Sequence, residues 1–361
     1  MLCSFLMPQV NQELIARRLN ISRTTVSRCF TNHRGINPNT RARVFSLAAK
    51  LGYQYLEPRS LSKKKKQSKT TRSIGVLICS DAEEFHRGDF ESPGVEMLPS
   101  ISEFAQLHHW QIEMHFVSPL AESIADDSYA AITSLKKRLF SGLLLMYPFA
   151  PRVIEELSTR FPCVSLVEQY GNTSVDCVDV DHYKGISMLI DRLCQHGHSR
   201  IGFFSRRYAV EAVWSLRRFS AYVEKLTRLG LPYIEKDVFH LDISTPQAMA
   251  IGYDHVRRQI ESGVTAWICA ADHQAYDLIA ALKKLGVSVP KDVSVTGFDG
   301  ILRPHDAPAL DTVQIPYYEI GFAASRRLFH KMHKRFDAPQ QILLDCRLQD
   351  GDTIGPCRTA H

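Results

Sequence analysis

The hydrophobic positions along the chain follow two different patterns, and the change between them falls near residue 73. Over residues 10–55 apolar side chains recur at helical spacing, whereas from residue 73 onward short apolar runs alternate with helical stretches. The first pattern predicts a few short helices. The second is typical of parallel sheets that are covered by helices on both faces. The chain is therefore expected to divide into a small helical part and a large α/β part.

The helical part has the pattern of a helix-turn-helix unit. An amphipathic stretch over residues 11–19 precedes a tight turn, after which Ser22 is placed to cap a second helix. Val26 and Phe30 form the apolar side of this second helix, whose other positions carry mainly Arg, Thr and Ser and no acid. A third helix is expected to begin at Pro38. A helix face of this composition is suited to meet the edges of base pairs.

The larger part is expected to contain seven strands with eight helices between and after them. The strands are expected at 74–78, 111–116, 142–146, 163–167, 200–204, 266–269 and 293–298, and the helices near 98–107, 130–140, 151–160, 183–196, 210–229, 247–262, 273–285 and 317–334. So long a region exceeds one sheet of this kind, and two lobes are expected. Ligands of such sheets bind at the carboxyl ends of the strands, so a cleft between the lobes is the expected site.

Charge is distributed unevenly along the chain. Residues 1–73 hold 15 Lys or Arg against 2 acids, whereas the remaining 288 residues hold 29 against 36. A basic end on a mildly acidic body indicates a nucleic-acid-binding domain joined to a domain of another kind. Between the two, residues 57–72 offer no apolar face and include four successive lysines, Lys63–Lys66. This segment is expected to be a cationic linker.

Several other classes of protein lack support in the sequence. No apolar run approaches the roughly 20 residues of a membrane span, and the first residues lack the basic region and cleavage site of a secretory signal. Nine cysteines stand singly, without metal or redox spacing, and are expected to be reduced thiols of a cytoplasmic protein. There is no phosphate loop, nucleophile motif or metal spacing, so neither an enzyme nor a cofactor is expected.

The second helix is expected to lie in the major groove of DNA, where its N-terminal residues reach the base edges. Arginine can form two hydrogen bonds with guanine, and threonine can contact a thymine methyl group or donate a hydrogen bond. The expected base contacts are Arg23, Thr24 and Thr25, with Ser27 and Arg28 one turn further along, and the expected phosphate contacts are Asn32, His33, Arg34, Arg41 and Arg43. Contacts of the second kind position a protein without reading the sequence.

With these motifs identified, the sequence resembles the lac repressor family of transcription regulators over residues 10 to about 350. The resemblance is carried by Ile15-Ala16, Ile21-Ser22, Thr25–Arg28, Asn32, Thr40–Val44 and Leu51–Tyr53, and in the body by Gly197–Gly202, Val289–Asp299, Pro308–Val313 and Ile320-Gly321. It implies an N-terminal all-α helix-turn-helix headpiece (8–56), a basic hinge or linker (57–72) and a two-lobe, periplasmic-binding-protein-like α/β body with parallel sheets (73–361).

The resemblance further implies a homodimer that binds double-stranded operator DNA, most simply as a repressor, and responds to a small-molecule effector, usually a sugar, held between the lobes. The positions that match the family's effector-binding residues are Arg218, Asp272 and Asp299; Glu168 and Asp81 are further candidates at the ends of expected strands, and Leu61 is the candidate for a wedge into the minor groove. Carboxylates accept hydrogen bonds from sugar hydroxyls, and arginine donates several in a fixed fork.

The chain departs from the family pattern in several places. Ala271 stands where the family has Asn, residues 79–97 follow no clean family pattern, and the linker is longer and richer in lysine. Two alternatives therefore remain: the effector is unusual, or the protein is a DNA-binding regulator without small-molecule control. A sugar-binding protein with a transport or other non-regulatory role is a further alternative, against which the basic N-terminal part argues.

Overall fold

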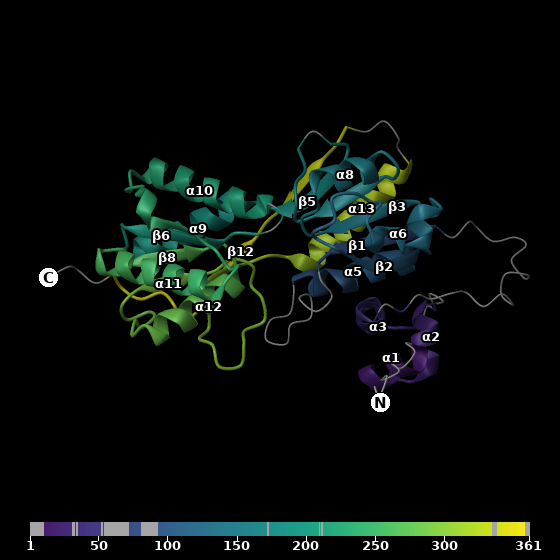
Figure 1. Ribbon diagram of the computed structural model, residues 1–361, viewed down its shortest axis with the longest axis horizontal. Coiled ribbons are helices and arrows are strands. Elements are labelled where there is room, and N and C mark those ends of the chain that lie inside the picture. Colours follow the sequence, from purple (N-terminus) through teal and green to yellow (C-terminus); the bar gives the residue numbers. More distant parts are fainter. Residues whose placement is uncertain are drawn as a thin grey trace, which may run out of the picture.

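The computed structural model describes residues 11–30, 33, 35–51, 53, 72–80, 93–171, 173–208, 210, 212–333 and 338–357. Figure 1 shows a small helical head beside one of two α/β lobes that lie next to each other. The head contains α1 (Gln12–Leu19), α2 (Arg23–Phe30) and α3 (Pro38–Lys50), so the three helices expected from the sequence are confirmed.

Local sequence explains where the head helices begin and end. The Asn11 side chain accepts a hydrogen bond from the first turn of α1, and Asn20, with a left-handed φ of 53°, ends the helix. Ser22 Oγ accepts the backbone N–H of Thr25 at 3.0 Å, which is the predicted cap of α2. Val26 is fully buried in the core of the head, as its place on the apolar side of the helix predicts.

Lobe 1 is built on a six-stranded parallel sheet in the order β11-β5-β4-β3-β1-β2. Its strands are β1 (Ser73–Cys79), β2 (Gln111–Val117), β3 (Gly142–Met146), β4 (Cys163–Leu166), β5 (Asp176–Val180) and β11 (Gln341–Leu344), and its helices are α5 (Pro93–Leu107), α6 (Asp127–Ala130), α7 (Thr133–Lys136), α8 (Pro151–Ser158) and α13 (Tyr317–His333). Helices α5 and α13 pack closely at Gly321 of α13. A Cβ at this position would lie 2.3 Å from Ser100 Oγ of α5, so a glycine is needed there.

Lobe 2 is built on a four-stranded parallel sheet in the order β7-β6-β8-β9. Its strands are β6 (Ile201–Arg206), β7 (Val238–Leu241), β8 (Ala266–Cys269) and β9 (Ser294–Thr296), and its helices are α9 (His182–Gln195), α10 (Val213–Leu229), η1 (Glu235–Asp237), α11 (Pro246–Glu261) and α12 (Asp272–Lys284). A small antiparallel pair, β10 (Thr312–Gln314) with β12 (Arg347–Gln349), lies alongside.

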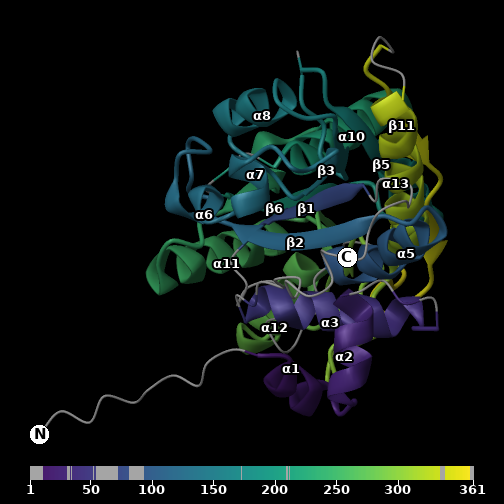
Figure 2. The same ribbon diagram turned by 90° about the vertical axis from the view of Figure 1, so that its right-hand side faces the viewer.

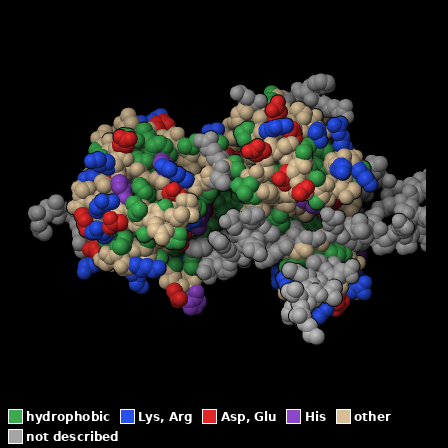
Figure 3. Space-filling view, viewed as in Figure 1, with side chains coloured by type: hydrophobic (Ala, Val, Ile, Leu, Met, Phe, Trp, Pro, Cys, Tyr) green, Lys and Arg blue, Asp and Glu red, His purple; other side chains and the backbone are tan. Residues whose placement is uncertain are grey.

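The chain passes between the two lobes more than once. It leaves lobe 1 after β5, returns to lobe 1 between β10 and α13, and leaves it again between β11 and β12. The carboxyl ends of β4 and β5 in lobe 1 thereby come opposite those of β6, β8 and β9 in lobe 2. Figure 3 shows the surface narrowing between the lobes, with apolar side chains in the recess and charges of both signs on the outer faces.

Each of the seven predicted strands is present, but the described residues contain five further strands, β5, β7, β10, β11 and β12, that were not expected. Strands at 142–146 and 266–269 are confirmed with the same bounds. The single helix predicted over 130–140 is wrong, because two short helices, α6 and α7, lie on either side of a break at 131–132. Strand β5 was not expected, since Asp176 and Asp179 occur within it; both are buried, and Arg327 pairs with Asp176 at 2.8 Å.

The cysteines of the described residues fit the expectation of reduced thiols. Six of these eight residues are buried, namely Cys29, Cys79, Cys163, Cys177, Cys269 and Cys346. Burial raises the pKa of the Cys29 thiol to about 11, which makes it a poor nucleophile near neutral pH. Within the described part of the chain, no helix is long and apolar enough to cross a membrane.

Candidate functional site

Helix α2 presents the predicted base contacts on its outer face. Arg23, Thr24 and Arg28 are exposed, whereas Thr25 and Ser27 are half-buried. Thr25 Oγ1 also lies 2.8 Å from Ser22 Oγ, so this side chain takes part in capping its own helix. The geometry therefore leaves Arg23 and Thr24 at the N-terminal end of α2 directed to solvent, as a groove-reading helix requires. Two further candidates, Asn32 and Leu61, and the lysine-rich linker lie outside the described residues.

The head rests on lobe 1 through α3. In Figure 2, α3 lies between lobe 1 and the other two helices of the head. Arg41 of α3 is 1% exposed; its Nη2 donates to the His33 carbonyl at 2.7 Å and its Nη1 to Gln106 Oε1 of α5 at 3.3 Å. Ile112 and Met114 of β2 pack against the head core. The predicted phosphate contact of Arg41 is therefore wrong for this arrangement, because its guanidinium is buried between head and lobe.

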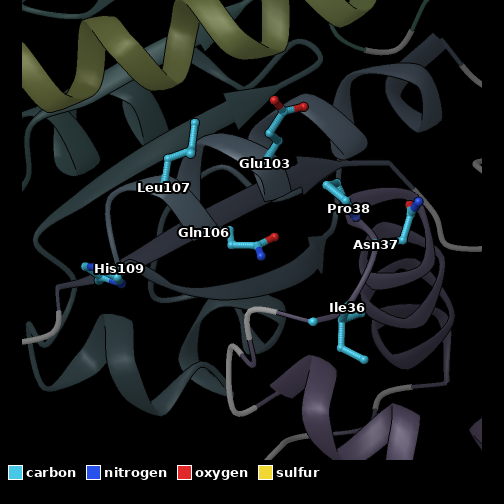
Figure 4. A pocket seen from close by; sticks show the side chains of 8 residues that line it. Ile36, Asn37, Pro38, Glu103, Gln106, Leu107 and His109 are labelled. Atoms are coloured by element: carbon cyan, nitrogen blue, oxygen red, sulfur yellow. The ribbon is translucent and has the colours of Figure 1, made fainter.

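An open pocket lies at the junction between head and lobe 1. It has a volume of about 780 Å³ and is lined by Gln106 and Leu107 from α5, by Pro38 at the start of α3, and by Ile36 and Asn37 just before it (Figure 4). The contact is thus tight around Arg41 and loose beside it. Apolar contact also crosses this junction, because Ala42 of α3 belongs to the hydrophobic core of lobe 1.

Arg218 is the centre of a buried network between the lobes. From α10 its Nη1 donates to Asp299 Oδ1 at 3.0 Å and to the Ala270 carbonyl, and its Nε donates to His182 Nδ1 at 3.3 Å. The guanidinium also lies 3.9 Å above the Phe298 ring. The predicted pairing of Arg218 with a carboxylate is therefore present, and these contacts hold both groups in place without a ligand.

The network continues from Arg218 into lobe 1. His182 Nε2 lies 3.0 Å from Asp179 Oδ2, at the end of β5, and Tyr317 donates its hydroxyl to Asp299 at 3.2 Å. None of Asp179, His182 and Tyr317 was predicted from the sequence. The acids that alternate with apolar residues just before His182 were the one available indication. A chain of hydrogen bonds thus joins a strand of lobe 1 to a helix of lobe 2.

Asp272 has its hydrogen bonds inside lobe 2. One carboxylate oxygen accepts the backbone N–H groups of Gly300 and Ile301 at 2.8 and 2.9 Å, and the other accepts the Thr312 hydroxyl. Gly297 is needed beside it, because a Cβ there would lie 2.2 Å from Asp272 Oδ1. The carboxylate therefore ties the loop after β9 to the start of α12. A contact between Asp272 and an effector stays a prediction.

Glu168, just after β4 of lobe 1, reaches across to lobe 2. Its Oε1 accepts the N–H of Val213 at 2.9 Å, at the start of α10, while its Oε2 is buried and has no hydrogen-bond partner. Burial raises the pKa of the Glu168 carboxyl to about 8, although the backbone N–H groups of Val213 and Trp214 act to lower it. This carboxyl thus joins the two lobes through Oε1, while Oε2 has no hydrogen-bond partner. Asp81, the last effector candidate, lies outside the described residues.

Three residues other than glycine adopt a positive φ just after strands that end at the cleft. They are Tyr147 after β3 (72°), Val167 after β4 (59°) and Asp299 after β9 (148°). A β-branched residue such as Val167 is strained in this region, and strain of this kind concentrates at binding sites. The strain at Val167 directs the next residue, Glu168, towards lobe 2.

Comparisons with known proteins agree with this architecture. Residues 14–55 match the family described as bacterial regulatory proteins, lacI family, and residues 190–354 match the periplasmic binding protein-like domain. Catabolite control protein A of Streptococcus mutans is 26% identical over 344 residues, which cover 94% of this chain and 96% of that protein. The transcriptional repressor CytR of Escherichia coli K12 is 27% identical over 343 residues, which cover 92% of this chain and 93% of that protein.

Solved structures show the same fold. A lac repressor dimer bound to operator and an anti-inducer has a TM-score of 0.63 at 20% identity, covering 95% of this chain and 98% of that one. The regulator CelR in complex with cellobiose has a TM-score of 0.64 at 20% identity, covering 96% of this chain and all of that one. The two-lobe fold with parallel sheets expected from the sequence is thereby confirmed.

Proposed function

Because the chain belongs to the lacI family of bacterial regulatory proteins, we propose that it is a transcriptional repressor that binds operator DNA as a homodimer and is controlled by a small-molecule effector. The effector is a sugar or a sugar-like molecule, as in the CelR–cellobiose complex, and it binds between the lobes. The protein is a regulator and not an enzyme, and it works in the cytoplasm, where its DNA is.

One observation carries the proposal: an exposed DNA-reading helix and an interlobe network occur in the same chain. Arg23 and Thr24 face solvent on α2, while Asp179, Arg218 and Glu168 join lobe 1 to lobe 2. A dimer suits the head, because one helix-turn-helix reads few base pairs and two half-sites multiply the discrimination.

The head–lobe contact offers a route from effector to DNA. A ligand that changes the angle between the lobes moves lobe 1, and α3 rests on lobe 1 through Arg41 and Gln106. Movement of lobe 1 therefore changes the orientation of α2 in each protomer. This couples two distinct sites through a shared rigid body, as allosteric control requires.

The function is tested by the mobility of DNA upstream of the protein's own gene and of neighbouring genes in a native gel. The full chain is expected to shift at least one of these fragments, and one sugar of a panel is expected to change the shift. A regulator without small-molecule control would give a shift that no sugar alters. The absence of any shift on every neighbouring promoter would contradict the proposal.

The variant Arg23→Ala is expected to weaken operator binding by about 1–3 kcal/mol, because it removes a side chain placed to pair with a base edge. Binding to unrelated DNA is expected to change little. Arg17→Ala is the matched control: Arg17 is an exposed arginine of α1, away from the reading helix. Its loss is expected to weaken specific and unrelated DNA alike. Equal losses on both DNAs for Arg23→Ala, measured by fluorescence anisotropy, would refute a reading role.

The linker lysines are expected to make DNA binding unusually sensitive to salt. Each phosphate that a lysine neutralises adds about −0.9 to the slope of log affinity against log salt concentration. Replacing Lys63–Lys66 by alanine is therefore expected to make this slope shallower while the preference for operator remains. An unchanged slope would show that these lysines do not meet phosphates.

A further inference from the structure

The cleft residues leave hydrogen-bond acceptors without partners. Glu168 Oε2, Gln169 Oε1 and Gln274 Oε1 lack any hydrogen bond, although the three residues are 1%, 5% and 0% exposed. The orientation of Gln169 is fixed, because its amide nitrogen donates to the Asp179 carboxylate at 3.2 Å, and a carboxylate only accepts. Buried polar atoms of folded proteins are almost always paired, so these oxygens indicate a missing donor.

The three acceptors come from both lobes. Glu168 and Gln169 follow β4 of lobe 1, and Gln274 lies in the first turn of α12 of lobe 2. The amide nitrogen of Gln274 donates to the Tyr208 hydroxyl at 2.7 Å, so its carbonyl oxygen is the atom without a partner. A ligand between the lobes that offers several donors would satisfy oxygens on both sides and hold the lobes together.

Most donors of the cleft are already engaged. Arg218 uses its Nε and Nη1 within the network, and Asp299 balances its charge. One donor at the end of β6, Arg206 Nε, lacks a partner, while Nη2 of the same guanidinium pairs with Asp277. The described cleft residues therefore offer one donor without a partner against three acceptors without partners.

Charge decides between kinds of donor. Among the described residues, no cation forms an ion pair with Glu168 or with Asp272, whereas Asp299 faces Arg218. Arg217, on the same helix as Arg218, is exposed to solvent and lowers the pKa of Glu168 less than the backbone N–H groups of Val213 and Trp214 do. An anionic ligand such as a sugar phosphate would be repelled here. Because burial raises the pKa of Glu168 to about 8, a neutral hydroxyl would meet a largely protonated carboxyl near neutral pH, whereas a cation would stabilise its charged form.

We propose that the effector carries an ammonium group, as an amino sugar does, and that this group pairs with the Glu168 carboxylate at the junction of the two lobes. The inference rests on the proposed function, since it names the chemistry of the effector in the same cleft. The ammonium supplies a donor and a positive charge at once, and the hydroxyls of the sugar supply donors to Gln169 and Gln274. Burial raises the pKa of Glu168 to about 8, and an ammonium group beside the carboxylate would lower it.

The test is calorimetric titration of the full chain near neutral pH with matched pairs of sugars. D-Glucosamine, D-galactosamine and D-mannosamine are compared with D-glucose, D-galactose and D-mannose, and with the corresponding hexose 6-phosphates. At least one amino sugar is expected to bind roughly tenfold or more tightly than its neutral counterpart, and the phosphates more weakly than either. This comparison uses the unaltered chain and does not depend on any variant folding.

A variant tests whether Glu168 causes the preference for amino sugars. Glu168→Gln keeps an oxygen to accept the N–H of Val213 but removes the charge, so the preference for the amine is expected to disappear. Glu155→Gln, an exposed glutamate of α8 in the same lobe, is the control and is expected to keep it.

Two results would overturn the inference. One is a neutral sugar that binds as tightly as its amino counterpart; if that sugar also changes operator binding, the proposed function stands and only the ammonium is wrong. The other is the failure of every amino sugar to bind at millimolar concentration. Failure of the proposed function itself would show separately, as the absence of operator binding in the native gel.

Discussion

Arg218→Met is expected to lower the free energy of unfolding by about 3–5 kcal/mol, because it leaves a buried carboxylate without its partner. Asp299 is 5% exposed, and after the substitution only the Tyr317 hydroxyl would remain as its described side-chain donor. Methionine keeps much of the apolar stem that packs near Phe298, so loss of volume is a minor part of the effect. Urea-induced unfolding followed by tryptophan fluorescence measures it, since Trp214 and Trp267 both lie in lobe 2.

A neighbouring arginine on the same helix provides the control for this substitution. Arg217→Met alters the preceding arginine of α10, which is exposed, and is expected to change stability by less than about 0.5 kcal/mol. Adding Asp299→Asn to Arg218→Met is expected to recover part of the loss, because the unpaired charge is then gone. A loss from Arg218→Met no larger than that from Arg217→Met would mean that the ion pair contributes nothing to folding.

The sequence predicts elements well where burial is uniform. Ala266–Cys269 is apolar at every position and lies in the middle of a parallel sheet, so the pattern and the structure coincide. Strand β5 escapes prediction because the partners of the buried Asp176, namely Arg327, Lys331 and the Gln340 N–H, lie 151 to 164 residues further along the chain. Pairing over such a distance leaves no periodic trace in the sequence.

The same limit applies to the cleft. Arg218 and Asp299 can be predicted as a pair from residue type and position, and the structure brings them together. The use of Asp272 cannot be predicted, since its hydrogen bonds go to the backbone of Gly300 and Ile301, and backbone carries no sequence signal. The unpaired oxygen of Glu168 likewise results from the packing of α10 against the end of β4.

Glu168→Gln is expected to change how stability depends on pH. The pKa of Glu168 rises from its ordinary value of 4.5 to about 8 on folding, because burial disfavours the charged form. Between these two pH values the folded state binds more protons than the unfolded state, so the contribution of Glu168 to stability falls as pH rises. The slope approaches about 1.4 kcal/mol per pH unit at its steepest. In the variant this part of the slope is absent.

From pH 4.5 to pH 8, the free energy of unfolding of the variant is therefore expected to rise by about 2–4 kcal/mol relative to that of the wild type, in the absence of effector. A constant penalty for the new amide nitrogen, which takes the unpaired position, shifts the whole curve but not its slope. Urea unfolding at a series of pH values measures the difference, with Glu155→Gln expected to run parallel to the wild type because that side chain is exposed. Parallel curves for Glu168→Gln and wild type would mean that Glu168 meets water or a cation in the folded protein. The premise that this carboxyl awaits a positively charged ligand would then fail together with the prediction.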